Sequence, residues 1–245
     1  MPARHLRPHG TSHQWKSVLE DDVSELKPPT AKVEARARTD AGVWAGSPSY
    51  HDAERWTWLF WSDAHSFRPL FEQLDLSHVL ELACGHGRHS EYLLAHYGLR
   101  LGSLVMMDIL QSNVDYCKAR LGQNGNLRVL VNNGIDFQPT PASSLTSIFC
   151  YDAMVHFDRR VVQSYLQDTA RVLVPGGKAL FHHSNYSFDP DCHFGTNPQA
   201  RAFMSKGLFA RYAERLGLEV LQQTVFDWGG EPGLDCLTLL AKSET

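Results

Sequence analysis

Short apolar runs alternate with segments of helical periodicity along most of the chain. The runs at 79–82, 102–108, 127–131, 145–151 and 178–182 are short enough to be buried strands. Apolar residues recur every three or four positions between most of these runs, which predicts helices. Strands separated by helices form parallel sheets. The last two runs, 218–226 and 234–241, have no helix between them, which predicts a terminal antiparallel hairpin. The pattern predicts a seven-stranded, mostly parallel α/β sheet with helices on both faces.

The first fifty residues differ from the rest of the chain. They contain five prolines and little periodicity, which predicts an N-terminal extension over residues 1–50, poorly ordered or lid-like, ahead of one domain over 51–245. Residues 14–26 fit a short helix. From Asp52, apolar positions with spacing near i, i+4, i+7 and i+11 predict a helix that reaches Leu74 and is broken or restarted at Pro69.

Composition narrows the class of protein. The 245 residues are 43% hydrophobic and 20% charged, with a formal net charge of −4 and no Lys/Arg run, so a nucleic-acid partner is not expected. The sequence contains no apolar run long enough for membrane insertion. Five dispersed cysteines without a CxxC pair fit reduced thiols. We therefore expect a cytoplasmic protein.

A glycine turn follows the first predicted strand. The segment 79–88 reads Val-Leu-Glu-Leu-Ala-Cys-Gly-His-Gly-Arg, and helical spacing continues after it. Gly85 and Gly87 have no Cβ, so the backbone can turn sharply and approach a ligand. A strand, glycine turn and helix in this order hold nucleotide-like cofactors in α/β proteins. A dinucleotide fingerprint would have glycine at position 90, where this chain has Ser90.

Polar residues stand at the ends of five successive predicted strands. In open α/β sheets, ligands bind beyond the carboxyl ends of the strands. The polar positions are 81–88, Asp108, Asn133, 152–156 and 182–185. Their recurrence at five successive strand ends predicts one shared binding site.

These segments together resemble a known enzyme family. Glu81-x-Ala83-x-Gly85-x-Gly87 resembles motif I of the class I S-adenosylmethionine-dependent methyltransferases, with Ala83 in place of the usual first glycine. With segments 132–137, 149–157, 173–177 and 181–185, the resemblance extends over about residues 75–241, to a bacterial group with members in sugar and cell-surface glycan pathways. It implies a Rossmann-like sheet, S-adenosyl-L-methionine as cofactor, and a small-molecule or glycan acceptor.

The resemblance also implies roles for individual residues in holding the cofactor. Asp108 would accept hydrogen bonds from the ribose hydroxyls, a role that fits a nicotinamide cofactor equally well. Asn133 would lie beside the adenine amino group, although a turn former before Gly134 has the same sequence. Glu81 would orient the turn and the cofactor's amino group, and Arg88 its carboxylate. The complete predicted set is Glu81, Ala83, Gly85, Gly87, Arg88, Asp108, Asn133 and Gly134.

Two histidines after strand ends are candidates for a general base. An alcohol attacks poorly while it keeps its proton, and a histidine can accept that proton near neutral pH. His156 and His183 fit this role, and Asp152 can orient one of them. We therefore expect O-methylation of a hydroxyl on a sugar or another polar small molecule. His182 and His183 point to opposite strand faces, so they are poor metal co-ligands and no metal is expected.

Three alternatives remain open. An N-methyltransferase acting on a small amine would need no strong base. A NAD(P)-dependent oxidoreductase would use a similar sheet, but Ser90 and the terminal hairpin disfavour it. A binding module without chemistry is disfavoured by the polar strand ends. Trp228 and Asp235, near the hairpin, border the acceptor pocket or serve packing.

Overall fold

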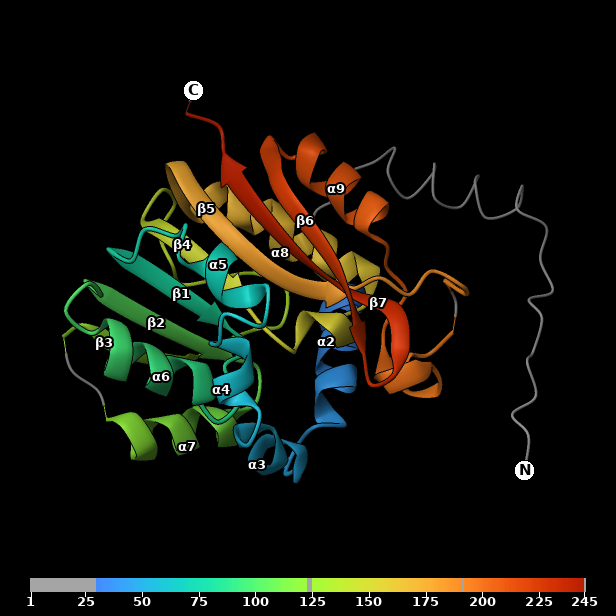
Figure 1. The fold of residues 1–245 in the computed structure, drawn as a ribbon, viewed down its shortest axis with the longest axis horizontal. Coiled ribbons are helices and arrows are strands. Elements are labelled where there is room, and N and C mark those ends of the chain that lie inside the picture. Colours follow the sequence, from blue (N-terminus) through green and yellow to red (C-terminus); the bar gives the residue numbers. More distant parts are fainter. Residues whose placement is uncertain (1–29, 123–124, 191, 245) are drawn as a thin grey trace.

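A single seven-stranded sheet forms the centre of the molecule (Figure 1). The computed structural model describes residues 30–122, 125–190 and 192–244; the predicted helix at 14–26 lies outside them. The strand order is β3-β2-β1-β4-β5-β7-β6. The strands are β1 (His78–Leu82), β2 (Ser103–Asp108), β3 (Leu127–Val131), β4 (Leu145–Cys150), β5 (Leu173–Ser184), β6 (Leu218–Trp228) and β7 (Glu231–Lys242).

The pairing directions confirm the predicted fold class. Strands β1 to β5 pair in parallel. Strand β7 lies between β5 and β6 and is antiparallel to both. The last two strands thus form the expected terminal hairpin. This is the predicted Rossmann-like sheet, with the carboxyl ends of its first five strands on one edge.

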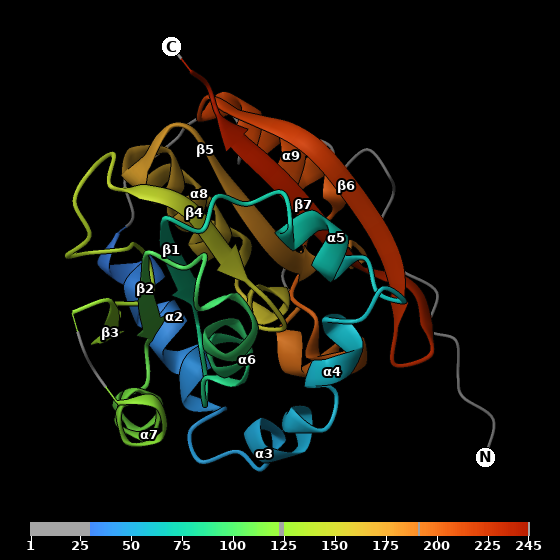
Figure 2. The same cartoon turned by 60° about the vertical axis from the view of Figure 1, so that its left-hand side comes forward.

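Helices cover both faces of the sheet and define two cores. Helices α2 (Ala31–Gly42), α8 (Arg159–Val172) and α9 (Lys206–Arg215) pack on one face. Helices α4 (Thr57–Phe60), α5 (Phe67–Phe71), α6 (Arg88–Tyr97) and α7 (Gln111–Leu121) pack on the other (Figure 2). Leu80 belongs to the first core and Val79 to the second, because successive strand residues point to opposite faces.

Side-chain caps fix where the later helices begin. The Asp158 carboxylate accepts a hydrogen bond from the Arg160 amide at 2.9 Å at the start of α8. The Ser205 hydroxyl accepts one from the Leu208 amide at 3.1 Å at the start of α9. Each cap satisfies a helix amide that lacks an intrahelical partner. Helix α8 ends at Val172, and β5 begins at the next residue, earlier than predicted.

The region from Asp52 to Leu74 departs from the predicted helix with a break or restart at Pro69. It contains the end of α3 (Ser49–Glu54), then α4 and α5. Pro69 lies in the first turn of α5, where its missing amide costs nothing. Trp61, between the short helices, packs edge-on against Phe67 and Phe71 at 5.0 and 4.8 Å between ring centroids. Aromatic packing therefore decides the path of this segment.

The described part of the N-terminal segment lies beside the carboxyl strand ends (Figures 1 and 2). Helix α2 buries Ala37 and Asp40. Helix α3 is held through Glu54, whose carboxylate pairs with Arg120 at 2.5 Å. The predicted domain boundary near residue 50 stays a prediction. In the described residues, no helix combines the length and apolar character needed to cross a bilayer.

Candidate active site

A cavity of about 350 Å³ opens at the carboxyl ends of the central strands. Its volume falls at the lower end of the range for small-molecule sites, about 300–1,000 Å³. The cavity is lined by eight of the predicted site residues, namely Glu81, Ala83, Gly85, Arg88, Asp108, Gly134, Asp152 and His156. Gly87, Asn133 and His183, also predicted, do not line it.

The turn after β1 takes a left-handed path beside the cavity. Ala83, Gly85 and Gly87 have φ angles of 55°, 54° and 80°. Glycine adopts this region freely, whereas a residue with a Cβ pays roughly 1–2 kcal/mol. Ala83 therefore carries strain at the position where the family usually has glycine. A Cβ on Gly87 would meet Cys117 Sγ at 3.1 Å, so Gly87 serves close packing beneath the turn.

Asp108 ends β2 and fixes the glycine turn from below. One carboxylate oxygen accepts a hydrogen bond from the Gly85 amide at 2.9 Å, and the other accepts from the Leu110 amide at 2.9 Å and Asn113 Nδ2 at 3.1 Å. Burial raises the pKa of Asp108, and the two amides oppose that shift. Each oxygen retains acceptor capacity for a ligand hydroxyl.

Glu81 is a buried carboxyl group near the end of β1. It is 3% exposed, and the Ser90 hydroxyl donates a hydrogen bond to it. Burial raises its pKa to about 8, against the lowering effect of Ser90 and Arg88. Glu81 is therefore mostly neutral at pH 7 in the protein alone. A bound cation would favour its ionised form.

The turn after β3 places Asn132, rather than Asn133, at the cavity. Asn132 Oδ1 accepts hydrogen bonds from the Gly134 amide at 2.6 Å and the Tyr165 hydroxyl at 2.5 Å. Asn133 Oδ1 instead accepts from the Ile135 amide at 3.0 Å, so this side chain forms the turn. The alternative reading of Asn133 as a turn former describes this geometry.

Arg88 links three parts of the cavity wall. Its guanidinium donates to the Ala53 carbonyl at 2.7 Å and to Asp152 Oδ2 at 2.8 Å. Asp152, directly after β4, has a φ of 57°. The charge of Arg88 is thus shared between helix α3 and the end of β4, both beside the glycine turn.

His156 lines the cavity in a defined tautomer. Its Nδ1 lies 2.7 Å from the Ala200 carbonyl oxygen, and a carbonyl only accepts, so Nδ1 carries a proton. Burial lowers the pKa of His156 to about 4, so the ring is neutral at pH 7 and Nε2 has a free lone pair. The indole of Trp44 packs on the ring with centroids 4.6 Å apart.

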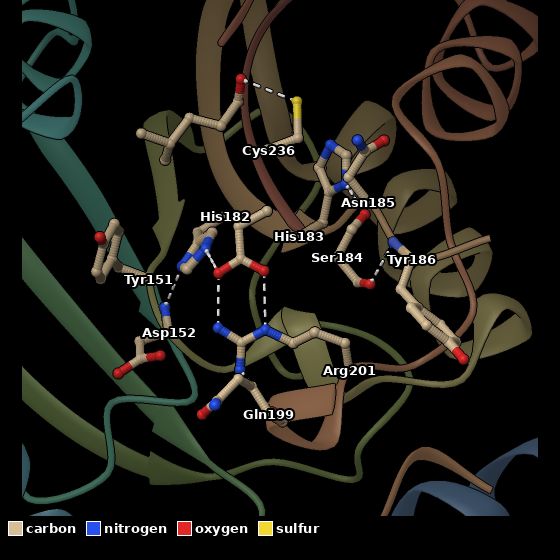
Figure 3. A network of polar contacts seen from close by, with 12 residues as sticks. Tyr151, Asp152, His182, His183, Ser184, Asn185, Tyr186, Gln199, Arg201 and Cys236 are labelled. Carbon is tan, nitrogen blue, oxygen red and sulfur yellow. Dashed lines mark hydrogen bonds and ion pairs between the residues drawn. The ribbon is translucent and has the colours of Figure 1, made fainter. Parts of the chain in front are cut away.

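His183 lies on the other face of β5, away from the cavity. Its ring stacks on Phe209 of α9 at 3.9 Å between centroids, and Nε2 contacts the Thr238 hydroxyl at 2.8 Å. His182 lies on the opposite face of β5, beside Tyr151 and Asp152 of the cavity wall (Figure 3). Its Nδ1 accepts a hydrogen bond from the Asp152 amide at 3.0 Å. The geometry gives no support to His183 as a base.

Several cavity residues were not predicted as site residues. Tyr50 covers the glycine turn so closely that a Cβ on Gly85 would meet its ring at 2.9 Å. Gln199 and Arg201 reach the cavity from the loop before α9, beside Trp228. The sequence offers no local signal for these positions, because each residue reaches the cavity from a segment that is distant in sequence from the strand ends. Trp228 was named as a possible border of the acceptor pocket, and it lines the cavity.

Comparison with known proteins finds a family model over part of this chain and solved structures with the same fold. Residues 79–177 match a family model described as a methyltransferase domain. Comparison with curated protein sequences finds no match. Solved structures show the same fold as this chain at low sequence identity.

Three of these structures illustrate the likeness. A chain of the complex between the Haloferax volcanii Trm112 methyltransferase activator and a methyltransferase has a TM-score of 0.62 and 18% identity, covering 83% of this chain and 97% of its own. An S-adenosylmethionine-dependent methyltransferase from Mesorhizobium loti has a TM-score of 0.56 and 12% identity, covering 72% and 97%. The [4+2]-cyclase SpnF has a TM-score of 0.57 and 12% identity, covering 79% and 82%.

The family match and the fold together support an S-adenosylmethionine-dependent methyltransferase. The Mesorhizobium loti structure is that of an S-adenosylmethionine-dependent enzyme, so the same cofactor can be compared with the cavity of this chain. The residues of the cavity fit that group in chemistry. Asp108 supplies carboxylate oxygens for hydroxyls, Ile109 and Leu110 supply apolar surface for a flat base, and Glu81 supplies a carboxyl group for a cationic centre.

Proposed function

We propose that the protein transfers a methyl group from S-adenosylmethionine to a hydroxyl of a sugar or another polar small molecule, with His156 as general base. The single observation that carries this proposal is the state of His156. Its Nδ1–H is held by the Ala200 carbonyl at 2.7 Å, which leaves the Nε2 lone pair to accept a proton. Asp108, Glu81, Gly85 and Arg88 would hold the cofactor.

For methyl transfer to a hydroxyl, the protein must align the two reacting groups and accept one proton. The bound cofactor supplies an electrophilic methyl carbon. The protein must hold the acceptor oxygen in line with that carbon, and such positioning can contribute several kcal/mol to catalysis. His156 would take the hydroxyl proton as the oxygen attacks. Its depressed pKa keeps it neutral, so acceptance of a proton is not blocked at any pH above about 5.

The walls around His156 support a polar acceptor with an apolar face. Trp44 and Trp228 offer indole surface, and Gln199 and Asp152 offer polar atoms. Ligand sites of this kind combine aromatic walls with few placed polar groups. A sugar ring, with apolar CH faces and hydroxyl edges, matches that combination.

The experiment measures methyl transfer from isotope-labelled S-adenosylmethionine to a panel of glycosides, other polyhydroxy compounds and small amines. Calorimetry with S-adenosylhomocysteine reports cofactor binding separately. In His156→Gln we expect kcat to fall about 100-fold or more, with cofactor affinity within threefold of wild type. His96→Gln is the matched control, because His96 Nδ1 also lies 2.9 Å from a carbonyl, that of Tyr92, on an exposed helix face.

Each alternative has its own result. If only amines in the panel are methylated, the acceptor is an amine and not a hydroxyl compound. An unchanged kcat in His156→Gln would show that His156 is not the general base. Absence of S-adenosylhomocysteine binding would reject methyl transfer altogether. Cofactor binding without transfer to any acceptor would favour a different reaction on this fold, as the cyclase neighbour illustrates.

A further inference from the structure

A buried ion pair joins Arg201, which lines the cavity, to Asp235; the contacts around Arg201 are drawn in Figure 3. Arg201 Nε and an Arg201 terminal nitrogen donate to the two carboxylate oxygens of Asp235 at 2.8 and 2.6 Å. The side chains are 3% and 0% exposed. Such a two-pronged contact fixes the plane of the guanidinium as well as its position. Asp235 lies on β7, paired with Ser184 of β5, so the pair is anchored on the sheet.

The pair holds a strained turn. Gln199 and Ala200, directly before Arg201, have φ angles of 49° and 55°. Two successive left-handed residues with side chains cost on the order of 1–2 kcal/mol each. The remaining Arg201 terminal nitrogen donates to the Gln199 carbonyl at 2.9 Å. Strain of this kind persists only where surrounding contacts determine the backbone.

The strained turn presents one carbonyl to His156. The Ala200 oxygen accepts the Nδ1–H bond that selects the tautomer with its lone pair on Nε2. Without that carbonyl, the proton would be free to move to Nε2, and this nitrogen could no longer accept one. The route from Asp235 to His156 therefore runs through Arg201 and two backbone carbonyls.

Asp235 also reaches the end of β4. Its Oδ2 lies 2.9 Å from His182 Nε2, and His182 Nδ1 accepts from the Asp152 amide at 3.0 Å. The amide can only donate to Nδ1, so Nε2 carries a proton and donates to Asp235. One carboxylate thus supports both Asp152, which precedes the helical turn Met154–His156, and His156, which is the last residue of that turn.

We propose that Asp235 and Arg201 are positioning residues that set the tautomer and orientation of His156. This inference rests on the proposed function of His156, but its structural part can be tested without any substrate. In this proposal the pair has no contact with the reacting atoms, although Arg201 borders the cavity. It acts by holding the Gln199–Ala200 turn where the Ala200 carbonyl meets Nδ1.

The first test reads the tautomer directly. The full chain is labelled with ¹⁵N-histidine, and the imidazole nitrogens are observed by NMR at pH 7, with the His156 signals assigned by their loss in His156→Gln. We expect wild-type His156 to show a single Nδ1–H tautomer. In Arg201→Lys and Asp235→Asn we expect a mixture of both tautomers, because the fork that holds the turn is lost. A single Nδ1–H tautomer in both variants would overturn the proposal.

The second test separates positioning from general stability. Arg171→Lys is the matched control, because Arg171 contacts Asp168 at 2.5 and 2.9 Å and the Thr140 carbonyl at 3.0 Å, the same set of contacts away from the cavity. Once an acceptor is known, Arg201→Lys should lower kcat about 10- to 100-fold with unchanged S-adenosylhomocysteine affinity. Arg171→Lys should leave both unchanged.

The outcomes distinguish this inference from the proposed function. If His156→Gln keeps full activity while the tautomer shifts in Arg201→Lys, the base role fails and the positioning geometry stands. If His156→Gln is inactive but Arg201→Lys changes neither tautomer nor kcat, the positioning role fails alone. If Asp235→Asn does not fold, Arg201→Lys decides. If neither folds while Arg171→Lys does, the pair is only a stability element and the proposal is rejected.

Discussion

The two ends of the cavity are built in different ways. At the cofactor end, local turn contacts accompany distant ones: Asp108 accepts from the Leu110 amide two residues away and from the Gly85 amide 23 residues away. At the acceptor end, the partners are distant: His156 and Ala200 are 44 residues apart, and Arg201 and Asp235 are 34 apart. The cofactor end thus includes turns that form their own hydrogen bonds, whereas the acceptor end depends on the assembled fold.

This difference has a consequence for how each end responds to change. A local turn forms its own hydrogen bonds, so a single distant substitution leaves it intact. A contact between distant segments depends on every element that brings them together. We expect substitutions in β7 or in the loop before α9 to alter acceptor turnover more than cofactor binding.

The largest expected effect is a loss of cofactor affinity when Asp108, at the cofactor end, is replaced. Asp108→Asn keeps one acceptor oxygen but loses the charge and one acceptor for both ligand and turn. Hydrogen bonds to charged groups contribute about 1.5–3 kcal/mol each, so S-adenosylhomocysteine affinity should fall at least about 100-fold by calorimetry. Asp115→Asn, which removes an exposed α7 carboxylate bonded to Gln111, is the control. Affinity within threefold of wild type in Asp108→Asn would contradict this role.

The next largest effect concerns the pH dependence of stability, because each end of the cavity has a buried carboxyl group with a shifted pKa. Burial raises the pKa of Glu81 to about 8. Burial would likewise raise that of Asp235, but hydrogen bonds from Arg201 and His182 lower it to about 2. For Glu81, the pKa in the folded protein lies above the value in the unfolded chain, which is near 4.5. The protonated carboxyl group therefore stabilises the folded state below pH 4.5, and this stability is lost as the pH rises through 8.

Glu81→Gln isolates this linkage, because glutamine can still accept from Ser90. The unfolding free energy of wild type minus that of Glu81→Gln, from urea titrations, should fall by about 2 kcal/mol between pH 5 and 8.5. The full linkage, about 1.36 kcal/mol per pKa unit, is reduced as the ionised carboxylate draws in water. A difference that stays constant or increases with pH would show that Glu81 ionises normally.

The smallest expected effect is a loss of acceptor turnover without a loss of cofactor affinity, which tests whether the two ends of the cavity act separately. Trp44→Ala removes the indole that packs on His156. We expect kcat/KM for the acceptor to fall about tenfold, about 1.4 kcal/mol, with S-adenosylhomocysteine affinity unchanged. Trp58→Ala, which removes an indole 64% exposed on α4, should change neither. Equal losses of cofactor and acceptor binding in Trp44→Ala would show that the two ends are not separable.

The fold followed from the sequence where the signals were local. The strand 127–131 was predicted at the bounds that β3 has, and helices lie between most of the parallel strands as the periodicity predicted. The helix expected from Asp52 was predicted to break or restart at Pro69, but the chain bends before it, between Phe60 and Phe67, because periodicity does not show where aromatic packing bends the chain. Trp61 is 2% exposed between two short helices.

The candidate site divides in the same way. Glu81, Gly85 and Asp108 were found from strand ends and a glycine turn, and they line the cavity. Asn133 and Asn132 are adjacent, and only the turn geometry shows which one faces inward. His183 and His182 could not be separated by sequence beyond the rule that they face opposite sides, because the facing side depends on which helices cover each face of β5.

The sequence alone determined the order of strands and helices, the terminal hairpin and the turn that approaches the cofactor. These features depend on the spacing of apolar residues and on glycine, which act over a few positions along the chain. Only the tertiary structure decided the acceptor end, where Trp44, His156, Arg201 and Asp235 come together from four separate segments. Contacts of that kind arise when the sheet and its helices pack, and no local pattern records them.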